Sequence, residues 1–271
     1  MPPPPQAATV AEIPPTRLSR GLVTLVLPAK DEEQGIGPTL RSLPLSTLEA
    51  MGFRTEVVVL DGASRDRTAA IARARGAEVI TEPARGKGYA LRSAVGRFRG
   101  DYVVMIDADS TYAPDAIPLV VEALAWGEAD VVMGSRRRGQ IAPGAMSPIN
   151  RLGNRLLSLA ASVLYLHPCS DLCTGLWGFR SDVLRALPLR ARGFELEAEL
   201  FALSVRSGLA VTEVPVDYLP RRGETKLGKV LDGVRIGLCL VRTRVALRRV
   251  ARLRTRTGRI EHPMAGTWGS P

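Results

Sequence analysis

The sequence predicts an α/β fold in which helices wrap a mostly parallel β-sheet. Apolar runs of strand length alternate along the first half of the chain with segments of helix length, the pattern of parallel strands joined by crossover helices. Polar clusters follow three of these runs, where such a sheet has its ligand crevice. The 271 residues are 45% hydrophobic, which is enough for a sizeable core.

The expected strands are short runs rich in aliphatic residues. They are residues 22–27, 56–60, 78–80, 102–106 and 130–133. Three segments between them have helix-forming composition, namely residues 68–75, 89–98 and 114–126. Asp66 is a candidate N-cap for the first of these helices, and Pro114 favours the start of the third.

The pattern changes after Gly134. Residues 150–166 and 194–205 are predicted as helices and residues 211–218 as a strand. The sequence shows no second core and no internal repeat, so we expect one main domain with flanking segments. The segments are a disordered Pro-rich lead at 1–20, the domain at 21–228, a basic amphipathic helical appendage at 229–257, and a disordered tail at 258–271.

Asp107 and Asp109 directly follow an apolar run, so they lie where a buried strand should end. Their carboxylates can meet on one hard cation, Mg²⁺ or Mn²⁺, which keeps further positions for substrate phosphate. Taken alone, this short motif is equally compatible with a solvated turn. Polar clusters also end the first two strands, at residues 30–32 and 61–64. Polar clusters thus follow three strands that should end at the same edge of the sheet. This favours a metal site over a solvated turn.

The three cysteines lack the paired spacing of a zinc site. Cys169, Cys173 and Cys239 are an odd number, which favours a reducing compartment over a disulfide framework. His167 lies near two of them, but it brings the set to only three candidate ligands where a closed zinc site needs four. We expect no zinc here.

The net charge of +10 is concentrated between residues 220 and 260, where thirteen Lys or Arg stand against two acidic residues. A basic segment can meet nucleic acid, an anionic membrane or only water. The residues interleaved with these charges are aliphatic, with no aromatic side chain for bases to stack on. This favours a helix on a membrane surface over nucleic acid. The longest apolar stretch, residues 156–166, is too short to cross a bilayer.

Two basic segments are candidates for binding phosphate. In the first, Arg85 and Lys87 flank Gly86, where a glycine lets the backbone approach an anion. The helix expected to follow adds an N-terminus that favours anions. A basic turn is the alternative.

The second segment contains Arg221, Arg222 and Lys226 around the hydroxyl of Thr225. Arginine binds phosphate oxygens in a forked geometry and lysine adds a point charge. Its glycines suggest a loop that closes on phosphate, and the alternative is a solvated basic face.

Motifs spread over about residues 22–235 resemble, in order, family 2 of the inverting glycosyltransferases, and most closely its polyprenyl-phosphate sugar synthases of the dolichyl-phosphate mannose and glucose type. The first-half motifs are Leu27-Pro28-Ala29-Lys30-Asp31-Glu32, Asp61-Gly62-Ala63-Ser64, Arg85-Gly86-Lys87-Gly88, Asp107-Ala108-Asp109 and Gly134-Ser135-Arg136. The second-half motifs include Asp171 with Thr174-Gly175-Leu176-Trp177, Gly193-Phe194-Glu195, and Arg222-Gly223-Glu224-Thr225-Lys226.

The resemblance implies the GT-A nucleotide-sugar transferase fold with a central mixed sheet, and it implies roles for residues. The implied donor-binding residues are Pro28, Ala29, Glu32, Asp61, Arg85, Gly86, Lys87 and Asp107. The implied phosphate- or acceptor-binding residues are Arg136, Arg221, Arg222, Thr225 and Lys226. Asp61 is similar to the acid that contacts the donor nucleoside. Asp31 stands where the family usually has Asn and Gly62 where a second Asp is common, so the nucleoside contacts can differ.

The acceptor decides whether a general base is needed. A lipid phosphate oxygen is already anionic and needs only positioning and charge screening, whereas a neutral hydroxyl must lose its proton to a carboxylate. The candidate bases are Asp171, Glu195, Glu197 and Glu199. The resemblance favours Asp171 and Glu199 as catalytic residues beside Asp109. Trp177 and Phe179 either line the sugar or lipid side or belong to the core.

The sequence thus predicts a Mg²⁺- or Mn²⁺-dependent inverting transferase that moves a hexose from a UDP- or GDP-linked donor to polyprenyl phosphate, peripherally bound at the cytosolic face of a membrane. Two alternatives remain: a transferase acting on a soluble hydroxyl acceptor, and a non-catalytic basic protein of this fold that binds membranes or nucleic acid. The sugar, the nucleotide base and the oligomeric state are not predicted.

Overall fold

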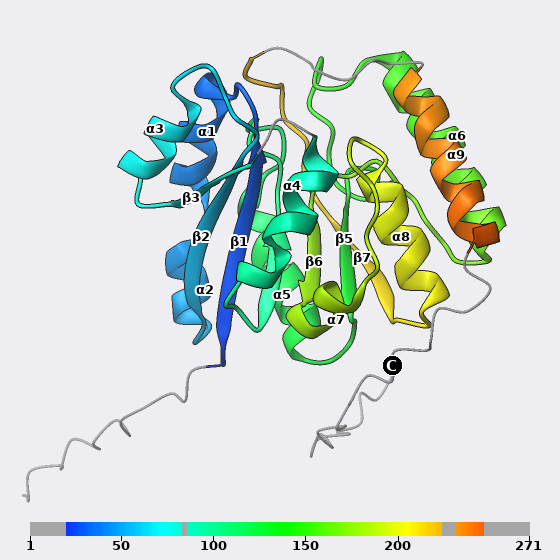
Figure 1. Cartoon of the computed structure of the whole chain (residues 1–271), viewed down its shortest axis with the longest axis horizontal. Coiled ribbons are helices and arrows are strands. Elements are labelled where there is room, and N and C mark those ends of the chain that lie inside the picture. The colour runs from blue at the N-terminus through cyan, green and yellow to red at the C-terminus, as the bar shows by residue number, and fades with distance from the viewer. Residues whose placement is uncertain (1–19, 83–85, 224–230, 247–271) are drawn as a thin grey trace, which may run out of the picture.

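The structure, a computed structural model, describes residues 20–82, 86–223 and 231–246. A seven-stranded sheet in the order β3-β2-β1-β4-β6-β5-β7 lies at its centre (Figure 1). The strands are β1 (Leu22–Ala29), β2 (Arg54–Asp61), β3 (Glu78–Thr81), β4 (Tyr102–Met105), β5 (Val131–Ser135), β6 (Trp177–Arg180) and β7 (Val211–Pro215). Only β6 runs antiparallel to its neighbours, β4 and β5. The predicted mostly parallel mixed sheet is confirmed.

The strands are apolar along their whole length because helices cover both faces of the sheet. Successive side chains alternate between two cores. Val26 and Met105 belong to one core, whereas Leu25 and Val104 belong to the other, and all four are fully buried. The sheet is therefore the middle layer of a three-layer structure.

One core lies under the helices α1 (Glu33–Ser42), α2 (Leu45–Ala50), α3 (Thr68–Ala74) and α5 (Ile117–Ala125). The other lies under α4 (Lys87–Ala94), α7 (Ser181–Ala186) and α8 (Leu196–Arg206). Short 3₁₀ turns, η1 (Val95–Arg97) and η2 (Pro114–Ala116), continue α4 and precede α5. The helices expected at 68–75, 89–98, 114–126 and 194–205 therefore occur, with shifted ends.

Two helices form an outer layer on α8, at the right of Figure 1: α6 (Pro148–Tyr165) and α9 (Leu231–Ala246). α6 begins where Ser147 Oγ accepts a hydrogen bond from the Asn150 amide, with Pro148 in the first turn. α9 occupies part of the predicted 229–257 appendage. The remainder of that appendage, the tail and residues 1–19 of the lead lie outside the described residues. None of the described helices combines the length and the hydropathy required to span a bilayer.

The elements that the sequence did not predict are α1, α2, β6 and α7. β6 is the most consequential because it inserts between β4 and β5 and so joins the two parallel parts of the sheet. Trp177 and Phe179 on this strand are fully buried, and their rings stack with centroids 5.9 Å apart. They are core residues and do not line a ligand site.

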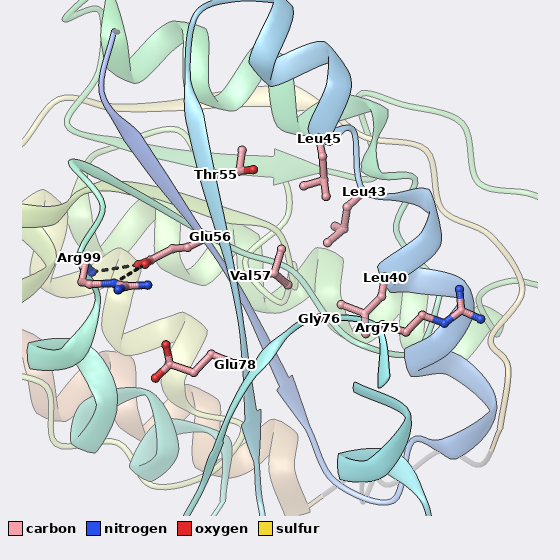
Figure 2. A pocket seen from close by; sticks show the side chains of 10 residues that line it. All are labelled: Leu40, Leu43, Leu45, Thr55, Glu56, Val57, Arg75, Gly76, Glu78 and Arg99. Carbon is pink, nitrogen blue, oxygen red and sulfur yellow. Dashed lines mark hydrogen bonds and ion pairs between the residues drawn. The ribbon is translucent and has the colours of Figure 1, made fainter. Parts of the chain in front are cut away.

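A pocket of about 310 Å³ opens beside the amino-terminal half of β2, at the opposite end of that strand from Asp61 (Figure 2). Glu56 lies on its wall and accepts hydrogen bonds from Thr24 Oγ1 at 2.5 Å and from Arg99 Nε at 2.7 Å. Burial raises the pKa of Glu56, but these hydrogen bonds outweigh it and hold the pKa below its usual value. Glu56 thus joins β1, β2 and the turn before β4.

Replacing Gly178 by alanine should destabilise the fold. A Cβ at Gly178 would lie 2.2 Å from Val120 Cγ1 of α5, where a branched side chain cannot yield freely. We expect Gly178→Ala to lower the free energy of unfolding by about 1–3 kcal/mol, measured by urea denaturation. Gly153→Ala in α6 is the control, because its Cβ meets nothing within 4 Å. It should change stability by less than about 1 kcal/mol, in the stabilising direction. Equal stability of both variants would contradict the packing argument.

Glu56→Gln should destabilise the protein in a pH-dependent manner. A carboxylate with a lowered native pKa contributes stability above its unfolded pKa and loses it as the pH falls through the native pKa. We expect Glu56→Gln to cost about 1–2 kcal/mol at pH 7. The gap between the two proteins should close in acid, below the usual glutamate pKa of about 4.3. Urea denaturation across this range measures it, and a pH-independent gap would show that charge plays no part.

Candidate active site at the carboxyl edge of the sheet

The carboxyl ends of β1, β2 and β4 lie at one edge of the sheet because these strands are parallel neighbours. Ala29 pairs with Asp61, so the predicted donor residues at the ends of β1 and β2 are adjacent. Each strand is followed by a non-glycine residue with positive φ: Asp31 at 48°, Ala63 at 55° and Ser110 at 63°. Backbone conformations of this kind concentrate at functional sites, where the surrounding structure must hold them.

Asp107 is bound by a half-buried lysine. Lys87 Nζ donates to Asp107 Oδ1 at 2.6 Å and to Glu197 Oε1 at 2.7 Å. Burial alone would lower the pKa of Lys87, but the two carboxylates outweigh it and raise the pKa above its usual value. Lysine is therefore charged in this position. The Asp107 side chain stays 31% exposed, so it remains accessible to a ligand.

Asp109 is bound by an arginine from the segment that follows β7. Arg221 donates from Nη1 to Asp109 Oδ2 at 2.6 Å and from Nη2 to Glu32 Oε1 at 2.5 Å. Thr111 donates its amide and hydroxyl to the other oxygen of Asp109. Burial and the nearby charge of Asp107 raise the pKa of Asp109, which shows that the two aspartates are electrostatic neighbours.

Asp61 is buried at the end of β2, at 3% exposure. Among the described contacts its carboxylate accepts from the Ser64 amide over 3.3 Å or more, which is a long hydrogen bond. Asp31 accepts from the Arg65 amide at 2.7 Å, and the Asp31 amide donates to Ser64 Oγ. The turns after β1 and β2 thus support one another around the predicted nucleoside-binding acid.

Gly175, which precedes β6, leaves room for the side chain of Asp107. A Cβ at Gly175 would lie 2.0 Å from Asp107 Oδ2, and the Gly175 amide donates to the hydroxyl of Tyr112. Gly86, a predicted donor-binding residue, packs closely against another loop. Its Cβ would lie 2.3 Å from the Arg192 carbonyl oxygen, so the glycine permits close packing against the 191–193 backbone. Arg85, from the same motif, lies outside the described residues.

Arg136 and Asp171 form a buried ion pair and do not serve as a free phosphate ligand and a free base. Arg136 donates from its amide and Nε to Asp171 Oδ2, and from Nη2 to Oδ1 at 2.6 Å. Asn154 donates to the same carboxylate, which is fully buried. The Arg136 guanidinium also lies over the rings of Tyr112 and Tyr218. Both side chains are thus engaged by protein partners in this structure, and their roles in binding and catalysis stay predictions.

Glu197, and not Glu199, is the carboxylate of α8 that lies at the site. Glu199 accepts from the amides of Arg190 and Ala191, and Glu195 accepts from those of Arg192 and Gly193, so both hold the loop before α8. Residues two apart on a helix do not share a face, so only one of the pair 197 and 199 can face Lys87. The helical spacing could be read from the sequence, but whether Glu197 or Glu199 faces Lys87 could not. Burial raises the pKa of Glu197, and Lys87 opposes that shift.

The predicted phosphate loop is only partly described. Arg222 donates its amide to the Asp109 carbonyl, and its side chain is exposed. Thr225 and Lys226 lie outside the described residues. Among the described side chains Arg221 Nε is buried without a hydrogen-bond partner. A buried guanidinium N–H without a partner is uncommon in folded proteins.

Asp107 and Asp109 fit a divalent cation through the chemistry of their oxygen ligands. Lys87 contacts Asp107 Oδ1 and Arg221 contacts Asp109 Oδ2, so a divalent cation would share these carboxylates with the two side chains. The described residues hold no cluster of three or more acidic, histidine or cysteine side chains arranged for a metal. A cation here would therefore take further ligands from substrate or water, as Mg²⁺ and Mn²⁺ do at phosphate sites.

The sequence matches Glycosyl transferase family 2 over residues 24–187. It is 37% identical over 214 residues to the low-salt glycan biosynthesis hexosyltransferase Agl6 of Haloferax volcanii, with 79% of this chain and 51% of the relative covered. The chain thus spans about half the length of that relative. It is 35% identical over 222 residues to a dolichyl-phosphate hexose transferase of the same organism, with 81% of this chain and 92% of the relative covered.

The structure is similar to that of glucosyl-3-phosphoglycerate synthase from Mycobacterium tuberculosis in complex with Mn²⁺, UDP-glucose and phosphoglyceric acid. The TM-score is 0.65 at 27% sequence identity, over 83% of this chain and 80% of that chain. This similarity confirms the predicted GT-A-type fold.

Asp171→Asn tests whether this residue is structural. Removing its charge leaves Arg136 buried and unbalanced, so the free energy of unfolding should fall by about 3 kcal/mol or more. The control is Asp182→Asn, which breaks the exposed pair between Asp182 and Arg180 and should cost less than about 1 kcal/mol. Chemical denaturation measures both. An Asp171→Asn protein of unchanged stability but without activity would restore the catalytic role.

Proposed function

Because the chain belongs to glycosyl transferase family 2, we propose that this nucleotide-sugar glycosyltransferase moves a hexose from a UDP- or GDP-linked donor to polyprenyl phosphate. The observation that carries the proposal is the pair Asp107 and Asp109 at the end of β4, each within hydrogen-bond distance of a buried or half-buried cation. We propose that these carboxylates hold Mg²⁺ or Mn²⁺ against the donor diphosphate. The bound ion would neutralise charge on the leaving diphosphate.

On the donor side, Lys87 and Arg221 are placed to act with that ion. Both are charged, and both contact the carboxylates at which the diphosphate would bind. As the glycosidic bond breaks, negative charge develops on the diphosphate, and preorganised cations stabilise it without rearrangement of solvent. Asp61 remains the proposed nucleoside contact. The Mn²⁺ and UDP-glucose bound by the similar synthase support this assignment of the donor site.

On the acceptor side, the four nominated bases are all engaged by the protein. Asp171 is paired with Arg136, Glu197 with Lys87, and Glu195 and Glu199 with backbone amides. A carboxylate held in this way is a poor base for a neutral hydroxyl. An acceptor whose oxygen is already anionic needs no base, and attack by it opposite the leaving group inverts the anomeric carbon. A phosphate acceptor thus suits this site.

The relative named as a dolichyl-phosphate hexose transferase supports a lipid phosphate, since the match covers most of both chains. Arg222 with Thr225 and Lys226 is proposed to bind that phosphate. A soluble acceptor is the second candidate, because the similar synthase binds phosphoglyceric acid. We propose that the protein works in the cytoplasm, peripherally on the cytosolic membrane face.

The decisive experiment is transfer of radiolabelled sugar from a panel of UDP- and GDP-hexoses to short polyprenyl phosphates, with Mg²⁺ or Mn²⁺. We expect an organic-extractable product from one donor. Asp109→Asn should reduce turnover more than about a hundredfold, because the metal ion that binds the diphosphate would lose one of its carboxylate ligands. Asp115→Asn, an exposed aspartate in η2, is the matched control and should keep activity.

The outcomes separate the candidates. In a parallel assay with phosphoglyceric acid as acceptor, label in a water-soluble product, with none in the organic phase of the lipid assay, would favour the soluble acceptor. Full activity of a folded Asp109→Asn protein, or activity in the presence of a chelator, would remove the metal proposal.

A further inference from the structure

α6 presents a stripe of apolar side chains to solvent. Its buried residues, such as Ser158 and Tyr165, face α8 and the core. The opposite face carries Ile149, Leu152, Leu156, Leu159, Val163 and, at the C-cap, Leu166, all at least 58% exposed. The spacing of three and four residues places them in one line along the helix. Exposed isoleucine, leucine and valine side chains in such a line mark an interaction surface.

α9 presents a second stripe of the same kind beside the first. Its members are Leu231, Val234, Leu238, Val241 and Val245, at 52–71% exposure. The two helices lie side by side (Figure 1) and make many contacts. The Tyr165 hydroxyl donates to the Leu240 carbonyl at 2.7 Å, and a Cβ at Gly237 would reach Leu157. The two stripes therefore form one apolar surface, the helix-pair face.

Arginines border this face on both sides. Leu157 marks the side of α6 that meets α9, and helical periodicity puts Arg151 and Arg155 on the other side of the α6 stripe. On α9, Arg235 and Arg242 lie beyond the α9 stripe, away from α6. Within Pro148–Tyr165 and Leu231–Ala246 the one acidic residue is Asp232, which is buried. Of the four arginines Arg235 is paired with Asp232, and the border as a whole carries a positive charge. An apolar centre with such a border complements an anionic lipid surface.

A pocket of about 320 Å³ lies at this border, lined by Met146, Pro148, Arg151, Leu152 and Arg155. It combines apolar walls with two guanidinium groups, and these match the acyl and phosphate parts of an anionic lipid. Two copies of the chain meeting through this face would instead bring arginine borders together, where like charges repel. The charge pattern thus favours lipid over a second copy.

We propose that the helix-pair face lies flat in the surface of an anionic bilayer, with its leucines among the acyl chains and its arginines on lipid phosphates. α6 itself contacts the wall of the candidate active site, because Asn154 on its buried side donates to Asp171, the ion-pair partner of Arg136. If the proposed lipid-phosphate acceptor is right, this placement brings the acceptor headgroup to the end of β4. The docking itself does not depend on that acceptor.

The test is co-sedimentation of the full chain with vesicles of phosphatidylcholine, with and without phosphatidylglycerol, and without polyprenyl phosphate. We expect binding to the anionic vesicles. The double variant Leu152→Glu with Leu159→Glu should weaken it at least about tenfold, since two leucine side chains are then lost from the acyl chains. Arg151→Glu with Arg155→Glu should weaken binding to anionic vesicles only.

The matched controls are Leu119→Glu on α5 and Arg73→Glu on α3, both exposed and away from this face. They should bind as the unaltered chain does. Unchanged binding of the leucine variant, with its fold verified by circular dichroism, would overturn the proposal. Dissociation of a dimer by that variant, seen in analytical ultracentrifugation without loss of vesicle binding, would assign the face to a second copy. A protein that binds vesicles but transfers no sugar to lipid would refute the acceptor and leave the docking face standing.

Discussion

Two side-chain cations neutralise the acidic edge of the sheet, and the geometry of the candidate site depends on them. Lys87 joins Asp107 to Glu197, and Arg221 joins Asp109 to Glu32. Carboxylates gathered at one edge repel one another, and burial raises the cost of each charge. The cations come from α4 and from the segment after β7, so the same contacts also tie distant parts of the chain to the end of β4.

The remaining polar groups of this region divide into those that hold the site and those that face it. The pair of Arg136 and Asp171 fixes the wall that carries Gly175, and Glu199 fixes the loop that packs on Gly86. These groups have their hydrogen bonds satisfied by protein. The Asp107 side chain, by contrast, is 31% exposed and retains capacity for a ligand. A site arranged in this way suits an anionic ligand that binds together with a divalent cation, such as a diphosphate with Mg²⁺ or Mn²⁺.

The parallel strands and their acidic ends could be predicted from the sequence because both are local signals: a run of aliphatic residues and the polar cluster that ends it. β6 could not, since Trp177 to Arg180 is short and becomes a strand only between β4 and β5. The choice between Glu197 and Glu199 depends on how α8 is rotated against Lys87, which tertiary packing decides. The pairing of Arg136 with Asp171 likewise joins residues that no local pattern connects.

The position of β6 also governs the order in which the site can be completed as the chain is synthesised. β1 to β4 form one contiguous part of the sheet in which only β4 has a later partner, β6, whereas both partners of β5 follow it in the chain. Strands that depend on distant partners are slow to form. Lys87 precedes Asp107 and is available as soon as β4 emerges, but Glu197 and Arg221 arrive only near the end. The emerging chain therefore carries Asp109 and Glu32 without their arginine until β7 has been made, and the reaction centre is among the last parts of the molecule to form.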